Sequence, residues 1–328
     1  MTDSDTDTEA DDDAPIRGEV RLADHRRVAH GLYLKKREGL GLDEELVRDL
    51  RAILLVLPEE AVFTHVTAAR LLGWQLPHLP EQLPVFAAVR TKDNRPRRPG
   101  LICSRLVREP QPIEAMGLPV DAPEEILLRA ARDCGSLDLA IMIDSARRLG
   151  HIDDDRMDKI LASKRPGVRV LRAAWALSHA KAESGGETVL RVFHTVMGVR
   201  VTPQVDLYAD DGRHLGRADL LVDGTPFLHE YDGEHHRSKK QQATDLRRER
   251  GWTGTSYVRR GYVLDDLINH PLVLMHEIDR ALGRPHVLSR LARWRRMVDN
   301  SMYSEIGRER VMNRWRRQTT LVDWSATA

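Results

Sequence analysis

The chain has 328 residues, of which 41% are hydrophobic and 31% charged, so it can bury a core and still present a polar surface. Its formal net charge of +1 conceals a strongly acidic start, because Met1 to Asp13 contain seven acids and no base. No run approaches the roughly 18 consecutive apolar residues of a membrane span, and this start lacks the basic and apolar regions of a signal peptide. Two cysteines cannot form a disulfide framework, so we expect a cytoplasmic protein without a membrane partner.

The first half of the chain is predicted to be an α+β domain over residues 15–181, preceded by a disordered acidic tail at residues 1–14. Hydrophobic periodicity and turn residues predict a β-like stretch, two helices, two strands and three helices. In chain order these elements cover residues 21–36, 46–57, 66–72, 83–90, 101–107, 123–134, 137–149 and 168–182. Thr64 is expected to cap the second helix and Gly73 to end it.

A second domain is predicted over residues 182–284, with the order helix, three strands, helix, strand. These elements are expected at residues 184–197, 204–209, 217–222, 227–231, 239–250 and 256–260. Beyond His270 the pattern is helical, and residues 285–328 form a basic helical extension. This order of helices and strands is typical of the α/β class.

Three carboxylates accompany two of these strands. Asp219 lies within an apolar strand, and Glu230 and Asp232 follow on the next one. Side chains alternate along a strand, so Glu230 and Asp232 share a face, and a hairpin would bring Asp219 beside them. Such a cluster repels itself unless a cation is present, and hard oxygen ligands suit Mg²⁺ or Mn²⁺. The alternative is that these acids are solvated and that Asp232-Gly233 is a turn.

These carboxylates belong to a longer pattern. It consists of Arg217-Ala218-Asp219-Leu220, then Glu230-Tyr231-Asp232-Gly233-Glu234-His235-His236, then Asp245 with Arg248. Glu187 opens the preceding helix within Glu187-Thr188-x-x-Arg191. Together they resemble the PD-(D/E)XK nuclease superfamily, in particular its branch of very-short-patch-repair endonuclease-like domains. The resemblance covers about residues 182–284.

The resemblance implies a restriction-endonuclease-like, three-layer core around a mixed sheet. It also implies a Mg²⁺-dependent DNA endonuclease that hydrolyses phosphodiester bonds by metal-activated water. Asp219 would be the bridging metal ligand, Glu230 the second and the Tyr231 carbonyl the third, while Glu187 would support the metal or its water. The helix with Asp245 and Arg248 would face the substrate, so Arg248 is a candidate contact to nucleic acid.

The sequence departs from the superfamily pattern in two places. Asp232 occupies the position of the usual lysine, which orients the attacking water; this branch commonly has Asp there. The general base is therefore open, and the candidates are His235, His236, Lys239 and Lys240. In addition, Gly251-Trp252-Thr253-Gly254 ends the helix that bears Arg248 earlier than is usual.

In the first half, the run Val62–Gly73 resembles a segment of actinobacterial AbiEi-type antitoxins. In that family the segment lies between a DNA-binding winged helix and a nuclease-like domain, but here too few residues precede Arg21 for a full winged helix. The resemblance implies a second function, a non-catalytic DNA-binding regulator of the type IV toxin–antitoxin kind on a degenerate nuclease scaffold. A toxin or another protein would then be its partner. A protein-binding module without a nucleic-acid partner is a third reading.

The C-terminal extension is rich in arginine. Residues 280–317 contain eleven Arg against three acids, interleaved with Trp294, Tyr303 and Trp315. Such a stretch can neutralise phosphates and stack on bases, with Arg314, Arg316 and Arg317 as candidate contacts to DNA. The alternative is a solvated amphipathic helix whose tryptophans dock on the core.

Overall fold

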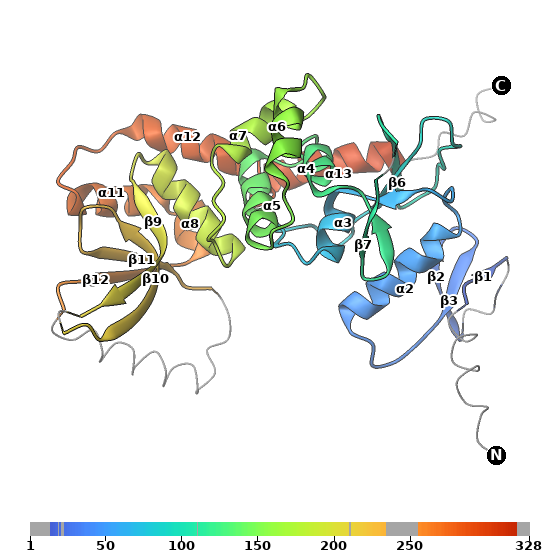
Figure 1. Cartoon of the computed structure of the whole chain (residues 1–328), viewed down its shortest axis with the longest axis horizontal. Helices are drawn as coiled ribbons and strands as arrows, with labels where there is room; N and C mark the ends of the chain where they lie inside the picture. The colour runs from blue at the N-terminus through green and yellow to red at the C-terminus, as the bar shows by residue number, and fades with distance from the viewer. Residues whose placement is uncertain are drawn as a thin grey trace, which may run out of the picture. The chain divides into compact units, whose positions relative to one another are not determined.

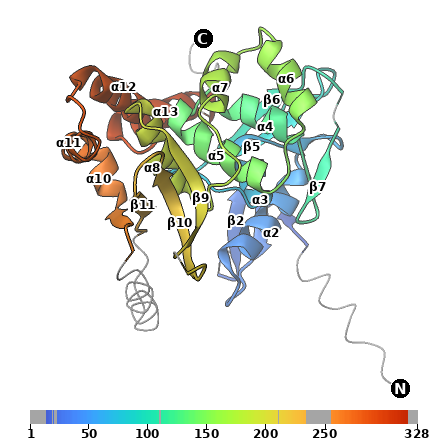
Figure 2. The same cartoon turned by 60° about the vertical axis from the view of Figure 1, so that its left-hand side comes forward.

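The structure of the chain is a computed structural model that describes residues 14–18, 20, 23–109, 111–209, 211–233 and 255–319. Within these residues the fold is mixed α/β, with three sheets and a helical C-terminal region (Figures 1 and 2). The predicted fold class is therefore confirmed. Except for Ala14, the predicted acidic tail lies outside the described residues, as does the helix expected over 239–250.

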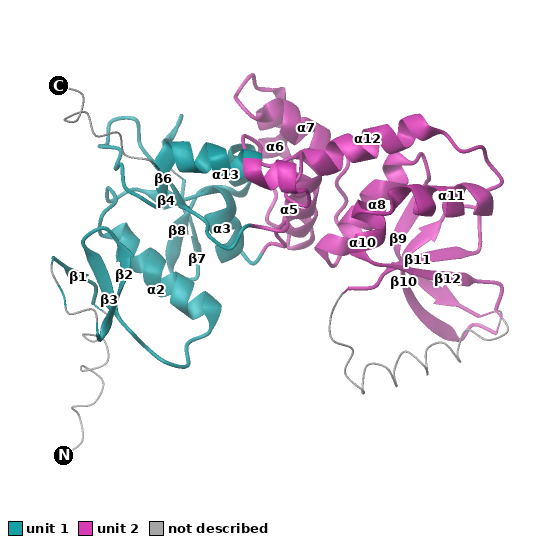
Figure 3. Cartoon of the chain, turned by 180° about the vertical axis from the view of Figure 1, so that it is seen from behind, with its two compact units in different colours: residues 1–73, 80–129, 310–328 teal, residues 74–79, 130–309 magenta. Residues whose placement is uncertain are grey.

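Two compact units divide the chain (Figure 3). Unit 1 comprises residues 1–73, 80–129 and 310–328, and unit 2 comprises residues 74–79 and 130–309. The sequence predicts a domain boundary near residue 181. In the structure, by contrast, the helices between residues 130 and 181 belong to unit 2. Among the described residues, no helix is long and apolar enough to cross a membrane.

Unit 1 is built on two sheets. A small sheet has the order β1-β3-β2, and a five-stranded mixed sheet has the order β6-β5-β4-β8-β7. The strands are β1 (Ile16–Arg17), β2 (His25–Ala29), β3 (Leu32–Lys35), β4 (Val62–Phe63), β5 (Val85–Val89), β6 (Leu101–Arg105), β7 (Ile113–Ala115) and β8 (Leu118–Val120). Helix α2 (Leu42–Leu54) buries Leu50 and Ile53, and α3 (His65–Leu71) is buried over most of its length. Helix α4 (Pro123–Ala130) runs from unit 1 to the start of unit 2.

Unit 2 combines several helices with a single four-stranded sheet. The helices are α5 (Ser136–Arg148), α6 (Asp154–Ala162), α7 (Val168–Trp175), α8 (Gly185–Val196), α10 (Leu264–Ile268), α11 (Pro271–Ala281) and α12 (Leu288–Asp299), and α13 (Glu305–Thr319) begins in this unit. One apolar cluster joins α5, α8, α11 and α12 to the sheet, with Phe193 and Trp294 at its centre. Their rings meet edge to face at a centroid distance of 5.1 Å. The core of unit 2 therefore lies between the sheet and these helices.

The sheet of unit 2 has the order β12-β11-β10-β9. Its strands are β9 (Val201–Tyr208), β10 (His214–Val222), β11 (Phe227–Tyr231) and β12 (Val258–Tyr262). The first three are antiparallel neighbours, and β12 is parallel to β11. Helix α8 covers the face on which Leu220 and Val222 are buried. The predicted succession of one helix, three strands and a final strand is thus present, with a mixed sheet.

Candidate functional site

Asp219 and Glu230 lie on neighbouring strands. Strand β10 pairs with β11 in a register that sets Leu220 opposite His229, and one step further the same register brings Asp219 opposite Glu230. Leu220 and His229 face α8, so the alternating Asp219 and Glu230 project from the other face of the sheet. A carboxylate oxygen of Asp219 also accepts a hydrogen bond from the Tyr231 backbone N–H at 2.9 Å.

Glu230 is paired with a cation from the next strand. The residue is 7% exposed, and its Oε2 accepts a hydrogen bond from Arg259 Nε at 2.6 Å. The Arg259 Nη2 group contacts the same oxygen. A buried carboxylate is costly without a counter-charge, and Arg259 on β12 supplies it. This role of Arg259 is not predictable from the local sequence, because it depends on β12 returning parallel to β11.

Asp232 continues the same face beyond the end of β11. Its backbone N–H donates to the Tyr262 carbonyl at 2.8 Å, which extends the pairing with β12 by one residue. Its side chain lies over Gly261, where a Cβ atom would be 2.0 Å from Oδ2. Only a residue without a side chain leaves this space, so Gly261 allows Asp232 to lie beside Glu230 over β12.

Tyr231, between these two acids, points to the opposite face. A Cβ atom on Gly186, in the first turn of α8, would lie 2.0 Å from Tyr231 Cε1. Gly186 therefore permits the close approach of the ring to the helix.

Glu187 also lies in the first turn of α8, three residues after the N-cap Ser184. The Ser184 hydroxyl accepts a hydrogen bond from the Glu187 backbone N–H at 3.2 Å. The Glu187 carboxylate accepts hydrogen bonds from the Glu183 N–H and from Gln204 Nε2 on β9, both at 2.8 Å. These bonds tie the start of α8 to the sheet. Among the described residues, no three His, Cys, Asp or Glu side chains are grouped closely enough to hold a metal ion. The candidate bases His235 and His236, with Arg248, lie outside the described residues.

The other residues of the Glu187-Thr188-x-x-Arg191 run hold a buried network. Asp144 on α5 is 1% exposed and accepts hydrogen bonds from Arg191 Nη2 at 2.7 Å, from Thr188 Oγ1 at 2.9 Å and from the His179 N–H at 2.6 Å. Burial raises the pKa of the Asp144 carboxyl, and Arg191 opposes the increase. This network joins α5 to α8, and it explains why these helices fall in one unit.

Two buried histidines lie between α8 and the sheet. His194 Nδ1 is 2.8 Å from the Leu190 carbonyl, and His194 Nε2 is 2.7 Å from His229 Nδ1. The carbonyl requires the proton on His194 Nδ1, so His194 Nε2 accepts from His229 Nδ1–H. Burial lowers the pKa of His194 to about 4 and that of His229 to about 3, which keeps both rings neutral at neutral pH.

The tryptophans of the C-terminal extension belong to the core. Trp294 is fully buried and donates from Nε1 to the Leu267 carbonyl at 2.7 Å. Trp315 is 2% exposed, and its ring meets that of Phe86 edge to face at 5.3 Å. The prediction that these residues dock on the core is confirmed, and their stacking on bases is excluded. Four arginines of α13 are exposed: Arg310, Arg314, Arg316 and Arg317.

Comparisons with known proteins give little guidance. No family model matches the chain, and no curated protein matches it. Among solved structures, it is similar to the crystal structure of RV2827C protein from Mycobacterium tuberculosis, with 16% identity over 57% of this chain and 73% of that chain and a TM-score of 0.34. A similarity this low transfers no function, so the function has to be argued from the residues.

Proposed function

We propose that the chain is a DNA endonuclease that depends on Mg²⁺ or Mn²⁺ and hydrolyses phosphodiester bonds with metal-activated water. One observation carries the proposal: Asp219 and Glu230 share the sheet face opposite α8, on adjacent strands, and Asp232 follows two residues after Glu230. The Asp and Glu at this spacing match the pattern that resembles PD-(D/E)XK nucleases. The mixed sheet and its leading helix are those such a domain requires.

The donor chemistry of this face fits a hard divalent cation. Asp219 and Glu230 would hold the ion through carboxylate oxygens, and the Arg259 contact to Glu230 indicates that a positive charge is stable at this position. When bound, such an ion lowers the pKa of a water molecule and offsets charge on the phosphate. Arg259 keeps Glu230 ionised and oriented, and it competes with the cation for the same oxygen. His235 and His236 are the candidates to take the proton from the water.

Plasmid cleavage with Mg²⁺, Mn²⁺ or EDTA tests the activity directly. We expect cleavage with either ion, none in EDTA, and none for Asp219→Asn, because the water loses its metal. Asp211→Asn is the matched control, since Asp211 is an exposed acid in the turn before β10. Titration calorimetry with Mn²⁺ separates binding from catalysis. If the wild type binds no Mn²⁺ at millimolar concentration, or if Asp219→Asn binds it equally well, the metal site is wrong.

The second candidate is a non-catalytic DNA-binding regulator on a degenerate nuclease scaffold. The observation that favours it is the pairing of Glu230 with Arg259, which satisfies the carboxylate without a metal. In this case a toxin or another protein would be a partner, and Asp219→Asn would leave DNA binding unchanged.

In both cases we expect the exposed arginines of α13 to contact phosphates. Each contact releases counterions, so the log–log dependence of affinity on salt should have a slope of about −0.9 per contact on duplex DNA. Replacing Arg314, Arg316 and Arg317 by Gln should flatten this slope. The free energy of unfolding should change by less than about 0.5 kcal/mol, because the side chains are exposed. An unchanged slope would assign this helix surface to packing or to a protein partner.

A further inference from the structure

A polar pocket lies between β12 and α11, on the face of the unit 2 sheet opposite the candidate metal site. Its volume is about 640 Å³, within the range of pockets that take small molecules. Six residues line it: Arg260, Gly261, Tyr262, Glu277, Arg280 and Ala281. Arg259, on the neighbouring position of β12, contacts Glu230 on the carboxylate face, so the pocket is distinct from the candidate metal site.

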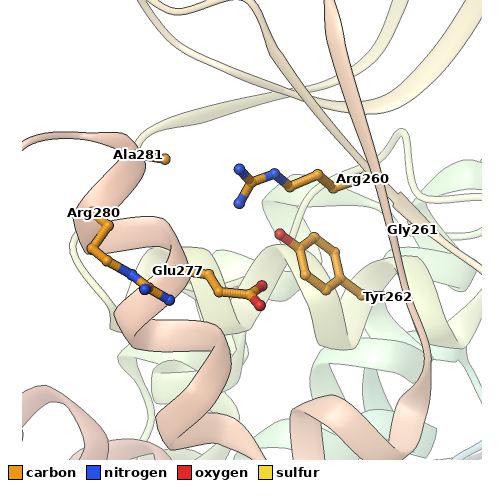
Figure 4. Close-up of a pocket in the computed structure, with 6 residues that line it drawn as sticks. All are labelled: Arg260, Gly261, Tyr262, Glu277, Arg280 and Ala281. Atoms are coloured by element: carbon orange, nitrogen blue, oxygen red, sulfur yellow. The ribbon is translucent and has the colours of Figure 1, made fainter.

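Two arginines, one tyrosine and one glutamate supply the polar groups that line this pocket. Figure 4 shows the Tyr262 hydroxyl directed toward the Arg260 guanidinium, with Glu277 and Arg280 on the facing helix. Arg260 is held in place by its position 5.7 Å from the centroid of the Phe227 ring. Arg280 is anchored by donation from Nε to the His276 carbonyl at 3.3 Å. Both arginines thus have defined positions and guanidinium donors left for a ligand.

The Tyr262 hydroxyl helps to orient Arg260 within this pocket. The residue is 5% exposed, and its side chain is hydrogen-bonded to that of Arg260. Burial raises its pKa to about 12, so it remains a neutral donor at neutral pH. Its ring packs edge to face on His229 at a centroid distance of 5.0 Å, and the neutral His229–His194 pair fixes it from behind.

From this arrangement we propose that the pocket binds a phosphate monoester of nucleotide size. Arg260 and Arg280 donate charge-assisted hydrogen bonds to the phosphate oxygens, and Tyr262 donates a neutral one. Glu277 repels the phosphate and accepts from a hydroxyl or amino group on the rest of the ligand. The same chemistry is found in a free nucleoside 5′-monophosphate and in the 5′-phosphorylated end of a DNA strand. The proposal does not depend on the metal site.

The full chain should be titrated with 5′-AMP, adenosine and inorganic phosphate by calorimetry. We expect 5′-AMP to bind, adenosine not to bind, and inorganic phosphate to bind more weakly because it makes no contact with Glu277. Arg280→Gln should weaken the binding of 5′-AMP at least about tenfold, since it removes a charge-assisted hydrogen bond. Tyr262→Phe should weaken it about fivefold, because it removes one neutral hydrogen bond and keeps the ring. The matched control is Arg295→Gln, an exposed arginine of α12, which should bind as the wild type does.

A pair of oligodeoxynucleotides with and without a 5′-phosphate identifies the source of the phosphate. Displacement of 5′-AMP by the phosphorylated strand alone supports the pocket and assigns it to strand ends, whereas displacement by neither strand supports a free nucleotide. The proposal is overturned if 5′-AMP fails to bind at 5 mM or if Arg280→Gln binds it as well as Arg295→Gln does. Plasmid cleavage by Arg280→Gln reports separately on the metal site, so the failure of either proposal is recognised independently.

Discussion

Asp144 and Glu230 are buried carboxylates of unit 2 that are each paired with an arginine, and their surroundings differ. Asp144 is enclosed on all sides: Arg191, Thr188 and a backbone N–H satisfy its oxygens, and the Arg191 side chain is 8% exposed. Glu230 is also buried, but the Arg259 side chain is 28% exposed and lies on the last strand of the sheet.

This difference distinguishes a structural ion pair from a carboxylate that is a candidate to bind a ligand. A carboxylate whose oxygens all accept hydrogen bonds from the fold cannot also bind a ligand. Its removal is therefore expected to change the free energy of unfolding. A carboxylate whose counter-ion is exposed can exchange that counter-ion, because the guanidinium can return to water at a modest cost. By this criterion Glu230, and not Asp144, is available to a metal ion.

The largest expected effect tests this contrast directly. Arg191→Met should lower the free energy of unfolding by about 3–5 kcal/mol, because it leaves Asp144 buried without a counter-charge. Arg259→Met should cost about 1–2 kcal/mol, because water can reach Glu230 from the side that Arg259 leaves. Urea unfolding at pH 7 measures both. Mn²⁺ should then stabilise Arg259→Met more than the wild type, since it replaces the lost cation.

A rescue variant checks the first of these effects. Adding Asp144→Asn to Arg191→Met should restore part of the lost stability, since the uncompensated charge is removed. Equal losses for Arg191→Met and Arg259→Met would contradict the distinction between the two pairs.

The neutral histidine pair predicts the next effect, as a function of pH. The pKa values of about 4 for His194 and about 3 for His229 lie below the unfolded value of 6.5, so the unfolded chain binds these protons first as pH falls. The free energy of unfolding should therefore be highest above pH 6.5 and fall toward pH 4, by at most about 1.4 kcal/mol per pH unit for each histidine. His194→Leu/His229→Leu should reduce this slope in urea unfolding at pH 7, 6, 5 and 4. Parallel curves for the variant and the wild type would refute the assignment.

Two glycines give the smallest expected effects and compare the two faces of the sheet. Gly186→Ala forces its Cβ against the Tyr231 ring and should cost about 1–3 kcal/mol, because the ring is packed and cannot retreat. Gly261→Ala meets the end of the Asp232 side chain, which can rotate away, so it should cost about 1 kcal/mol or less. Thermal unfolding measures both changes. The second variant should also weaken Mn²⁺ binding, since it displaces Asp232.

Much of the fold of unit 2 is predictable from local pattern. The strand over Phe227–Tyr231 has the predicted bounds, and the helix predicted over 184–197 is α8 at Gly185–Val196. Helix α6 was not predicted, because it begins with a run of aspartates and buries only Met157 and Ile160. Strand β4 has two residues, too few for any alternation to be visible.

The site is predictable only where it depends on local sequence. Alternation and the turn between β10 and β11 were enough to group Asp219 with Glu230. The roles of Arg259 and Gly261 depend on the parallel return of β12, and nothing in the sequence near β11 sets that register. The same limit applies to Asp144, which is 47 residues before Arg191. A long-range partner of this kind leaves no periodic signal.

Strand β12 presents consecutive arginines to the two faces of the sheet, Arg259 toward Glu230 and Arg260 toward the polar pocket. Five residue pairs with β11, from Phe227–Val258 to Tyr231–Tyr262, set this assignment. In the described sheet β12 is the terminal strand and is held by this one ladder. A slip by one residue would turn both guanidinium groups to the wrong sides. A ligand that holds Arg260 would therefore favour the register that directs Arg259 toward Glu230.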